Sequence, residues 1–511
     1  MSRHAHWLFA AALSIATLVA GCSGNGDDET TDPFTVTFPS SFLWGSANSA
    51  YQSEGNFQPG GGRVQSNWSR WEDLGRIKTG ETNDRGADFY DRYDADFGLA
   101  EHDGHNAIRL GVEWARIEPQ RGVFDAAAMD HYVQVIDAAR GHGLNPVVTL
   151  YHWVVPLWVE DPSTGVDAFA EPVNHDLWDR FDEYVRYVVA RIGDRVDYYV
   201  PFNEPFSVVS AGYLVGEHPP GKAFDLAGAT NYLANVAFMH ARAYRTIREL
   251  DHDDADGDGR ATMIGMANIA NPFYPKDPNN PGDVKGAQTL SYIVNELLNN
   301  ALVHGDLDLT LDGDTDDSET VPPEGNYPEL AGTLDYMGIN YYGPVRVVEF
   351  GPPIYGYPLL SVDDYDPLLP HNGLGTEISA PDFRVALDLY ARYGLPLLIT
   401  ENGTDTREYD QRAMYLMEHV YVLGQAIKDG LPVLGYLHWS LTDNFEWAEG
   451  YASRFGLYRI DYDTPDFARM RTSGADALQA IIRGNRIDRT LYEQYVADRY
   501  PSDQRPAAMS E

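Results

Sequence analysis

Short apolar runs alternate with amphipathic stretches along most of the chain, from residue 42 onward. Several runs are apolar over nearly their whole length, which is typical of strands buried on both faces of a parallel sheet. Apolar residues three and four positions apart predict helices between them, at 132–140, 178–192, 385–392 and 414–429. The predicted strands are residues 42–47, 107–112, 146–151, 198–202, 263–269, 336–341, 396–400 and 433–438.

Eight strands with helices between them predict an α/β fold, a (β/α)8 TIM barrel with inserted loops. A doubly wound sheet is the alternative, and it normally places a glycine-rich phosphate-binding turn after its first strand. Here the first predicted strand leads into Asn48, Ser49, Ala50, Tyr51 and Gln52, which is not such a turn. The pattern therefore favours the barrel, and we expect it to occupy residues 34–511 as one domain.

Length and charge narrow the classes of function. A chain of 511 residues, 43% of them hydrophobic, has ample material for one large core. The formal net charge is −40, from 77 acidic and 37 basic side chains, and it would repel the phosphates of nucleic acids. We therefore expect no nucleic-acid partner. Aromatic residues make up 12% of the chain, which suits a sugar-binding cleft, although most aromatic side chains fill cores.

The first 21 residues read as a targeting signal. Arg3 precedes an apolar run at 7–20 that is too short to span a bilayer comfortably. The run ends at Gly21-Cys22 and resembles a bacterial lipoprotein signal, in which the cysteine becomes the lipidated first residue. Cys22 is the sole cysteine, so no internal disulfide can form. We expect residues 22–33 to be a flexible tether and the protein to be exported and lipid-anchored to a bacterial membrane, on its periplasmic or cell-surface side. An ordinary signal peptide with an incidental cysteine is the alternative.

Two acidic insertions interrupt the barrel pattern, at residues 251–260 and 306–324. In the first, Asp254, Asp256 and Asp258 precede Gly259 and match the first half of a calcium-binding loop. The twelfth position of that pattern, where a bidentate Glu is expected, is Gly265. These residues predict a structural Ca²⁺ site, and a solvated acidic loop is the alternative. The second insertion repeats the spacing less well, with acidic residues at 312, 314 and 316 and Asp instead of Gly at 317.

Two glutamates, Glu204 and Glu401, follow predicted strands that lie far apart in the sequence. The carboxyl ends of barrel strands meet at one face, so the two carboxyl groups are expected to share a pocket. Two such groups perform glycosidic bond cleavage when one protonates the leaving oxygen and the other attacks the sugar carbon or activates water. A single glutamate at a strand end would more often be a cap or an ion-pair partner.

Further polar and aromatic residues lie in or directly after the predicted strands. Each residue alone is weak evidence for a binding site, because an arginine at a strand end usually pairs with a carboxylate and a tryptophan there usually packs in a core. Together they form the hydrogen-bonding and stacking set of a sugar site. They are Gln52, Arg109, His152, Trp153, Asn203, Asn340, Tyr342, Trp439, Glu446 and Trp447.

With these residues and the motifs that contain them, the chain resembles glycoside hydrolase family 1, the β-glucosidase and β-galactosidase family. The resemblance covers about residues 38–463 and occurs in the family's order. It is carried by FLWGSA at 42–47 with YQSEG at 51–55, TLYHW at 149–153, FNEP at 202–205, GINYY at 338–342, ITENG at 399–403 and WSLTDNFEW at 439–447.

The resemblance implies an exo-acting, retaining hydrolase of terminal β-D-glucosides, galactosides or fucosides that needs no cofactor for catalysis. It gives Glu204 the role of acid/base and Glu401 that of nucleophile. Asn203 would bind the sugar 2-hydroxyl, and Trp439 would form the stacking floor. The residues implied to support the nucleophile are Arg109, Asn340 and Tyr342, and those implied to bind the other sugar hydroxyls are Gln52, His152, Trp153, Glu446 and Trp447.

Departures from the family pattern fall beside these residues. Val154-Val155 stands where Asp-Leu is usual, and Leu110-Gly111 where Phe-Ser is usual. Glu446 would be replaced in the branch that cleaves 6-phosphosugars, so we expect a non-phosphorylated substrate. Two other functions stay open. A transglycosidase would use the same residues, and an inactive glycan-binding member would normally have lost a catalytic carboxylate.

Overall fold

The computed structural model describes residues 32–57, 61–311, 315, 320–349, 360–362, 371–407 and 409–496. The predicted signal peptide with Cys22, nearly all of the predicted tether and the acidic residues at 312, 314, 316 and 317 lie outside the described residues.

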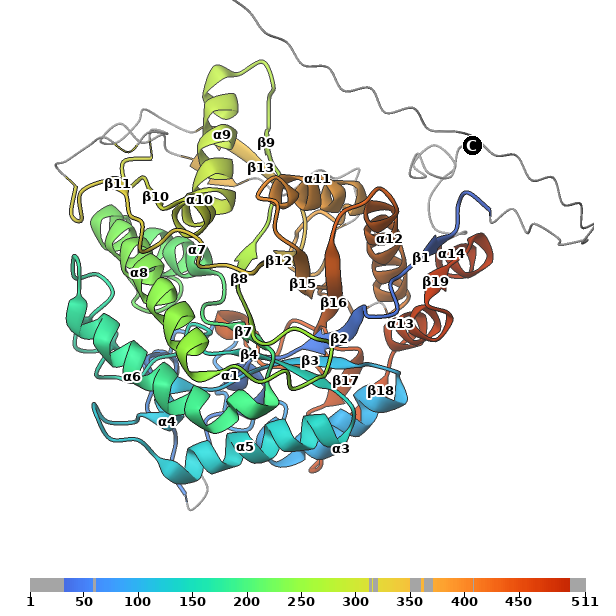
Figure 1. Ribbon diagram of the computed structural model, residues 1–511, viewed down its shortest axis with the longest axis horizontal. Coiled ribbons are helices and arrows are strands. Elements are labelled where there is room, and N and C mark those ends of the chain that lie inside the picture. The colour runs from blue at the N-terminus through green and yellow to red at the C-terminus, as the bar shows by residue number, and fades with distance from the viewer. Residues whose placement is uncertain are drawn as a thin grey trace, which may run out of the picture.

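Eight parallel strands form a closed barrel, as predicted (Figure 1). Each strand pairs with the strand that follows it in the barrel, and the last pairs with the first. The predicted strand ends agree with the observed ones to within about two residues, the usual disagreement at element boundaries. The strands are β2 (Leu43–Ala47), β3 (Ala107–Gly111), β4 (Asn145–Thr149), β7 (Tyr198–Val200), β8 (Met263–Ile269), β12 (Tyr336–Tyr341), β15 (Leu397–Asn402) and β16 (Val433–Trp439).

Helices surround the barrel and connect its strands (Figure 1). The four predicted helices are present, but α5, α11 and α12 begin five or six residues earlier than their apolar patterns indicate. The start of α11 is set by a cap, in which the Ser379 hydroxyl accepts from the backbone amide of Asp382. The main helices are α3 (Phe89–His102), α5 (Ala126–Gly141), α6 (His175–Ile192), α8 (Leu226–Leu250), α9 (Pro281–Asn295), α10 (Leu297–His304), α11 (Ala380–Ala391), α12 (Tyr409–Lys428), α13 (Ser473–Gly484) and α14 (Arg489–Val496).

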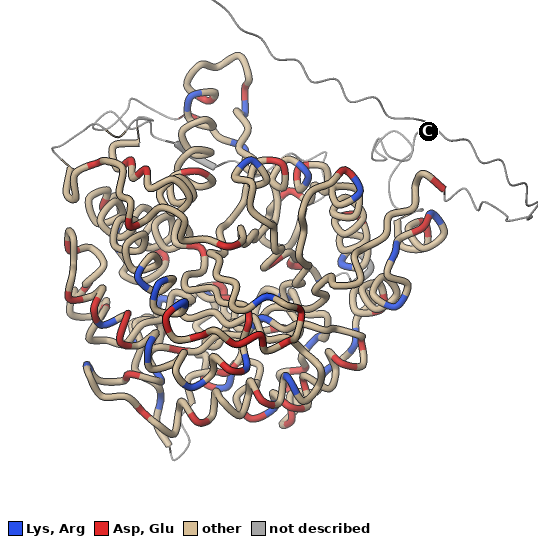
Figure 2. Tube along the Cα trace, in the orientation of Figure 1, with Lys and Arg blue, Asp and Glu red and all other residues tan. Residues whose placement is uncertain are grey.

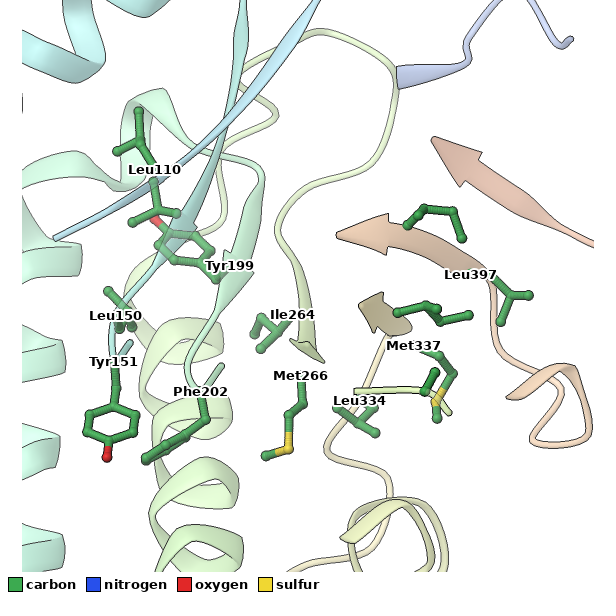
Figure 3. Close-up of a cluster of buried hydrophobic side chains, with 14 of the residues drawn as sticks. Leu110, Leu150, Tyr151, Tyr199, Phe202, Ile264, Met266, Leu334, Met337 and Leu397 are labelled. Atoms are coloured by element: carbon green, nitrogen blue, oxygen red, sulfur yellow. The ribbon is translucent and has the colours of Figure 1, made fainter. Parts of the chain in front are cut away.

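Side chains of the barrel strands alternate between two apolar clusters, as the two-residue period of a strand requires. Leu110, Tyr199 and Leu397 point outward and pack against the helices (Figure 3). Their neighbours Tyr198 and Leu398 belong to a second cluster inside the barrel. Burial on both faces explains why these strands are continuous apolar runs in the sequence.

Insertions lie between the barrel elements. The short helices are α1 (Ala50–Glu54), α2 (Asn67–Asp73), α4 (Trp114–Ile117), α7 (Pro205–Val208), the π-helix η2 (Val209–Val215) and the 3₁₀ helices η1 (Gly193–Arg195) and η3 (Trp447–Glu449). The small strands are β1 (Val36–Thr37) with β19 (Arg486–Ile487), β5 (Glu160–Asp161) with β6 (Val166–Asp167), β9 (Phe273–Pro275) with β13 (Val345–Glu349) and β14 (Leu360–Val362), β10 (Asp306–Leu307) with β11 (Gly325–Asn326), and β17 (Tyr458–Asp461) with β18 (Ala468–Arg471).

Acidic residues are spread over the outer helices and loops and outnumber the basic ones there (Figure 2). Within the described part of the chain, no helix combines the length and the apolar character that crossing a membrane requires.

Candidate active site

Glu204 lies at the carboxyl end of the barrel, between β7 and α7. It adopts a left-handed backbone conformation, with φ 43° and ψ 63°, which non-glycine residues rarely occupy and which is found preferentially at functional sites. Its backbone amide donates to the carbonyl of Ala267 on the neighbouring strand β8, at 2.7 Å. Pro205 opens the following helix. The turn therefore fixes the direction in which the Glu204 side chain leaves the backbone.

Glu401 lies in β15, where the pairing with β16 is irregular between Ile399 and Asn402. Such irregularities re-aim side chains and are common beside active sites. Gly403 follows closely, and a Cβ at this position would lie 2.0 Å from the carbonyl oxygen of Trp439. Only glycine allows this approach of two backbones, which explains one residue of the Glu-Asn-Gly motif.

The carboxylate of Glu401 is bound on both oxygens. Arg109, in β3, donates from Nη1 to Oε1 at 2.5 Å, and the Tyr342 hydroxyl donates to Oε2 at 2.6 Å. Arg109 is fully buried, and its Nε donates to the Thr149 hydroxyl at 3.0 Å. A buried arginine and a buried glutamate offset each other's charge, so removing either one leaves an unpaired charge in the barrel.

Two asparagine amides connect the glutamates. Asn340 donates from Nδ2 to Oε1 of Glu204 at 2.7 Å, and the same side chain also interacts with Glu401. Asn203 accepts at Oδ1 from Arg109, at 2.6 Å, and its Nδ2 lies 3.1 Å from Nε2 of His152. The two carboxyl groups are thus close enough to contact one amide, and they share one network.

The two glutamates differ in their charge environment. Burial, followed by the negative charge of Glu401, raises the pKa of Glu204 to about 7. Burial also raises the pKa of Glu401, but the Arg109 guanidinium and the Tyr342 hydroxyl oppose that rise. A positive charge beside one carboxyl and a negative charge beside the other push the two pKa values apart. Near neutral pH this favours a protonated Glu204 beside an ionised Glu401.

The remaining predicted residues line the same end of the barrel. Gln52 donates to Glu446 Oε2 at 3.2 Å. Trp447 packs between rings, with the Trp153 centroid at 4.6 Å and the His152 centroid at 5.8 Å. Trp439 is the last residue of β16, and its ring lies 6.1 Å from His152. The structure therefore brings all twelve predicted pocket residues into one set of neighbours.

Glu446 is surrounded by negative charge. Burial, followed by the charges of Asp405, Glu401 and Glu204, raises the pKa of Glu446 to about 8, while the hydrogen bond from Gln52 opposes the rise. Such a group responds strongly to hydroxyl donors brought by a ligand, because these stabilise the ionised form.

Sequence reasoning did not single out several neighbours of these residues. The Ser207 hydroxyl donates to Glu204 Oε2 at 2.7 Å, and the Thr400 hydroxyl donates to Asn340 Oδ1 at 2.6 Å. Asp405 is a neighbour of Glu446. Ser207 follows Glu204 by three positions in a helix start, a spacing that brings side chains together. Thr400 belongs to the ITENG motif, which does not show that its hydroxyl bonds Asn340, and no sequence spacing connects Asp405 with Glu446.

The carboxylates that lie together at the predicted calcium loop differ from the predicted set of three. Among the described residues, carboxylate oxygens of Asp254 and Asp256 group with Asp197, within 4.8 Å of one another, and Asp258 is not in this group. Asp197 precedes β7 and lies far from the loop in the sequence, so local spacing could not reveal it. Calcium binding at this loop stays a prediction.

A closed (β/α)8 barrel with two buried glutamates, an arginine and a stacking wall at its carboxyl end is the architecture of a glycoside hydrolase. The glycosyl hydrolase family 1 model matches residues 34–487. The chain belongs to this family, and it is a β-glycosidase.

The chain is similar in sequence and in structure to known β-glycosidases over most of its length. It is 32% identical to β-glucosidase A of Thermotoga maritima over 447 residues, which covers 84% of this chain and 94% of that protein. It is 29% identical to a β-galactosidase of Pyrococcus woesei, covering 89% and 99%. Among solved structures, a family 1 β-glucosidase from Thermotoga maritima matches with a TM-score of 0.77 at 31% identity, covering 89% and 99%. A β-glycosidase from Pyrococcus horikoshii matches with a TM-score of 0.77 at 27% identity, covering 92% and 100%.

Proposed function

We propose that the protein is a retaining, exo-acting β-glycosidase that hydrolyses terminal, non-phosphorylated β-D-glucosides, galactosides or fucosides in two displacements. The observation that carries the proposal is the asymmetry of the two carboxyl groups. Glu401 accepts from the charged Arg109 and from Tyr342, whereas the donors to Glu204 among the described residues are the uncharged Asn340 amide and Ser207 hydroxyl.

In the first displacement, the ionised Glu401 attacks the anomeric carbon while Glu204 donates its proton to the glycosidic oxygen. The bond between that carbon and that oxygen breaks, the aglycone leaves as an alcohol, and a glycosyl ester of Glu401 forms. The ester carries no charge, so the electrostatic cause that helped to raise the pKa of Glu204 disappears. Glu204 is then suited to take a proton from water, which attacks the anomeric carbon, breaks its bond to the Glu401 oxygen, regenerates the Glu401 carboxylate and releases the sugar with its β configuration. No step uses a cofactor.

The proposal fixes the direction of the pH dependence. The first step needs Glu204 protonated, and its pKa is raised to about 7. We therefore expect kcat/KM to fall as the pH rises through about 7, and to fall again at acid pH, where Glu401 gains a proton.

The substrate class follows from the charges around Glu446. Asp405 and the ionised Glu401 already place negative charge there, which disfavours a phosphate dianion in either protonation state of Glu446. Hydroxyl groups can donate to these carboxyl groups instead. A neutral sugar therefore suits this end of the pocket better than a 6-phosphosugar.

Proton NMR of the first-formed product tests the mechanism. With p-nitrophenyl β-glucoside as substrate, the β-anomer should appear first and then mutarotate. An α-anomer formed first would mean inversion and would overturn the double displacement. The same reaction with added alcohol acceptors separates hydrolysis from transglycosylation, and no turnover at all would favour a glycan-binding role.

We also propose the division into signal peptide (1–21), tether (22–33) and barrel domain (34–511), with lipidation at Cys22 and export to a bacterial membrane. The small residues before a sole cysteine and the polar residues after it support this. Replacing Cys22→Ser should move the enzyme out of the membrane fraction without changing its specific activity. Unchanged fractionation together with an unlipidated mature N-terminus would contradict it.

A further inference from the structure

A small cavity lies behind the sugar-binding wall, between α1 and the ends of β3 and β4. Its volume is about 10 Å³, which is close to the space that a single water molecule occupies in protein cavities. Two of the residues that line it are polar and of special interest, Glu113 and His152. Most of the other lining residues are apolar, including Gly111 and Leu150; of the hydroxyl residues among them, Tyr51 donates to Glu72 and Thr149 accepts from Arg109.

Glu113 is a buried glutamate at the start of α4, with 4% of its surface exposed. Neither of its carboxyl oxygens has a hydrogen-bond partner among the described residues. A buried carboxyl group without donors is costly and is rarely retained without a reason.

Hydrogen-bond donors of two neighbouring residues, Tyr184 and Arg116, are directed to other groups. The Tyr184 hydroxyl donates to the carbonyls of Val112 and Leu150, at 2.9 and 3.0 Å. Arg116 donates from Nη1 to the carbonyl of Phe57, at 2.9 Å, and its Nε lies 3.1 Å from Glu54. No described residue donates to either oxygen of Glu113, so a water molecule in the cavity can supply the donor.

The imidazole of His152 also lines the cavity, and one of its nitrogens lacks a hydrogen-bond acceptor. Asn203 Oδ1 accepts from Arg109 and from Asn340, so the amide nitrogen of Asn203 is the group that faces His152 Nε2. That nitrogen can only donate, so Nε2 accepts and the imidazole proton is on Nδ1. Nδ1 is buried and has no partner among the described residues. It is a donor that needs an acceptor.

We propose that one water molecule in this cavity accepts from His152 Nδ1–H and donates to the carboxyl group of Glu113. Glu113 is then a positioning residue for the sugar site. It holds the neutral His152 tautomer whose Nε2 accepts from the Asn203 amide, and so fixes the orientation of both side chains at the sugar site. This inference rests on the proposed function, because that function makes His152 a sugar contact. Carboxylate partners behind a functional histidine commonly fix its tautomer and ring orientation.

The charges around the cavity agree with a neutral imidazole. Burial, followed by the positive charge of Arg109, lowers the pKa of His152 well below its usual range. Burial raises the pKa of Glu113 to about 7, Arg116 opposes the rise and Glu54 adds to it. In either protonation state, Glu113 keeps an oxygen that accepts from water.

Three variants separate positioning from a structural role. Glu113→Met removes the acceptor and keeps the length, Glu113→Gln keeps an acceptor oxygen, and Glu118→Gln is the matched control. Glu118 is also buried and on the same segment, but Trp114 and the amide of Gly122 donate to it at 2.8 and 2.7 Å. We expect Glu113→Met to lose about three- to tenfold in kcat/KM without a lower unfolding temperature. Glu113→Gln should recover most of the loss, and Glu118→Gln should show none of it.

The loss should also be coupled to His152. With monodeoxy p-nitrophenyl β-glucosides, Glu113→Met and His152→Ala should weaken discrimination against the same analogue. The double variant should lose no more than His152→Ala alone. Equal losses on every analogue, additive losses, or a drop in unfolding temperature that accounts for the lost activity would overturn the proposal.

A crystal structure of the wild-type enzyme at high resolution gives a test that does not depend on turnover. We expect an ordered water within hydrogen-bond distance of both His152 Nδ1 and Glu113. A dry cavity, or a direct protein partner for either group, would overturn the proposal. If Glu401→Ala kept full turnover, the proposed function would fail while this water could still be present, so the two failures are distinguishable.

Discussion

Two groups of clustered carboxylates, the pair Glu204 and Glu401 and the acidic loop with Asp254 and Asp256, receive their hydrogen bonds from different sources. In the barrel, donors come from side chains on separate strands, above all Arg109 and Asn340. In the loop, the donors to Asp254 are backbone amides of the loop itself, those of Gly257 and Gly259 at 2.8 and 2.9 Å.

This difference decides what each cluster can do. Carboxylates bound by their own backbone fix a turn, which is a local and structural role. Carboxylates held by side chains from several strands keep a set position relative to one another, and their pKa values can be pushed apart. Burial raises the pKa of Asp197 beside the loop to about 6, yet Arg140 nearby donates to the carbonyl of Ala255 rather than to a carboxylate. Acidic residues alone therefore do not make a catalytic pair.

The largest expected effect comes from replacing Glu401→Ala. Without the nucleophile no ester can form, and kcat should fall by at least about 10⁴-fold on every substrate. Turnover of p-nitrophenyl β-glucoside by protein purified away from any wild type measures this. Near-normal activity would remove Glu401 from the mechanism.

Replacing Glu204→Ala should have an effect that depends on the leaving group. Glycosides of poor leaving groups should lose about 10²–10⁴-fold in kcat/KM, because the departing oxygen needs a proton. Glycosides of very good leaving groups should keep most of their first-step rate. A comparison of alkyl and dinitrophenyl glucosides measures the difference. Equal losses on both substrates would argue against Glu204 as the acid.

Replacing Glu446→Ser tests the sugar end of the pocket. Loss of a charged acceptor in a buried site should cost about ten- to one-hundredfold in kcat/KM on glucosides. The loss should be smaller on fucosides, which lack the 6-hydroxyl. Wild-type kinetics on glucosides and 6-phosphoglucosides provide the control, and faster cleavage of the phosphorylated substrate would contradict both the role of Glu446 and the substrate class.

The smallest effect on activity should come from the acidic loop. Asp254→Asn keeps only one of the two acceptor oxygens that the glycine amides use, but the loop takes no part in the network around Glu204 and Glu401, so kcat/KM should stay within about twofold of wild type. If the loop binds Ca²⁺, millimolar calcium should raise the unfolding temperature of wild type by about 2 °C or more relative to EDTA, and that of the variant less. Identical unfolding temperatures of wild type in calcium and in EDTA would show the calcium prediction to be wrong.

The barrel was predictable because its strands are buried on both faces, which leaves long apolar runs such as residues 336–341 and 263–269. Helix starts were less visible. The first turn of α11 is capped by Ser379 and contains Pro381, and neither residue belongs to an apolar pattern. Boundaries are set by polar caps, whereas periodicity reports only the buried face.

The site was predictable where residues fall in motifs, as Glu204 and Glu401 do, and not where a single side chain is recruited from elsewhere. The charge of Asp405 acts on Glu446, and no local spacing encodes that pairing. Thr149 lies in the TLYHW motif, but the motif does not show that its hydroxyl accepts from Arg109. Glu113 was missed for a further reason. Its meaning depends on a cavity and on the orientation of the Asn203 amide, which only the three-dimensional arrangement supplies.

Trapping the glycosyl-enzyme tests the central claim most directly. A 2-deoxy-2-fluoro-β-glucoside with a good leaving group slows both displacements but still allows the first, so the ester accumulates. Peptide mapping by mass spectrometry should then find the fluorosugar on the peptide that contains Glu401, and the trapped enzyme should be inactive. A label on a peptide without Glu401, or no label at all while ordinary glucosides yield the α-anomer first, would contradict the division of roles between Glu204 and Glu401.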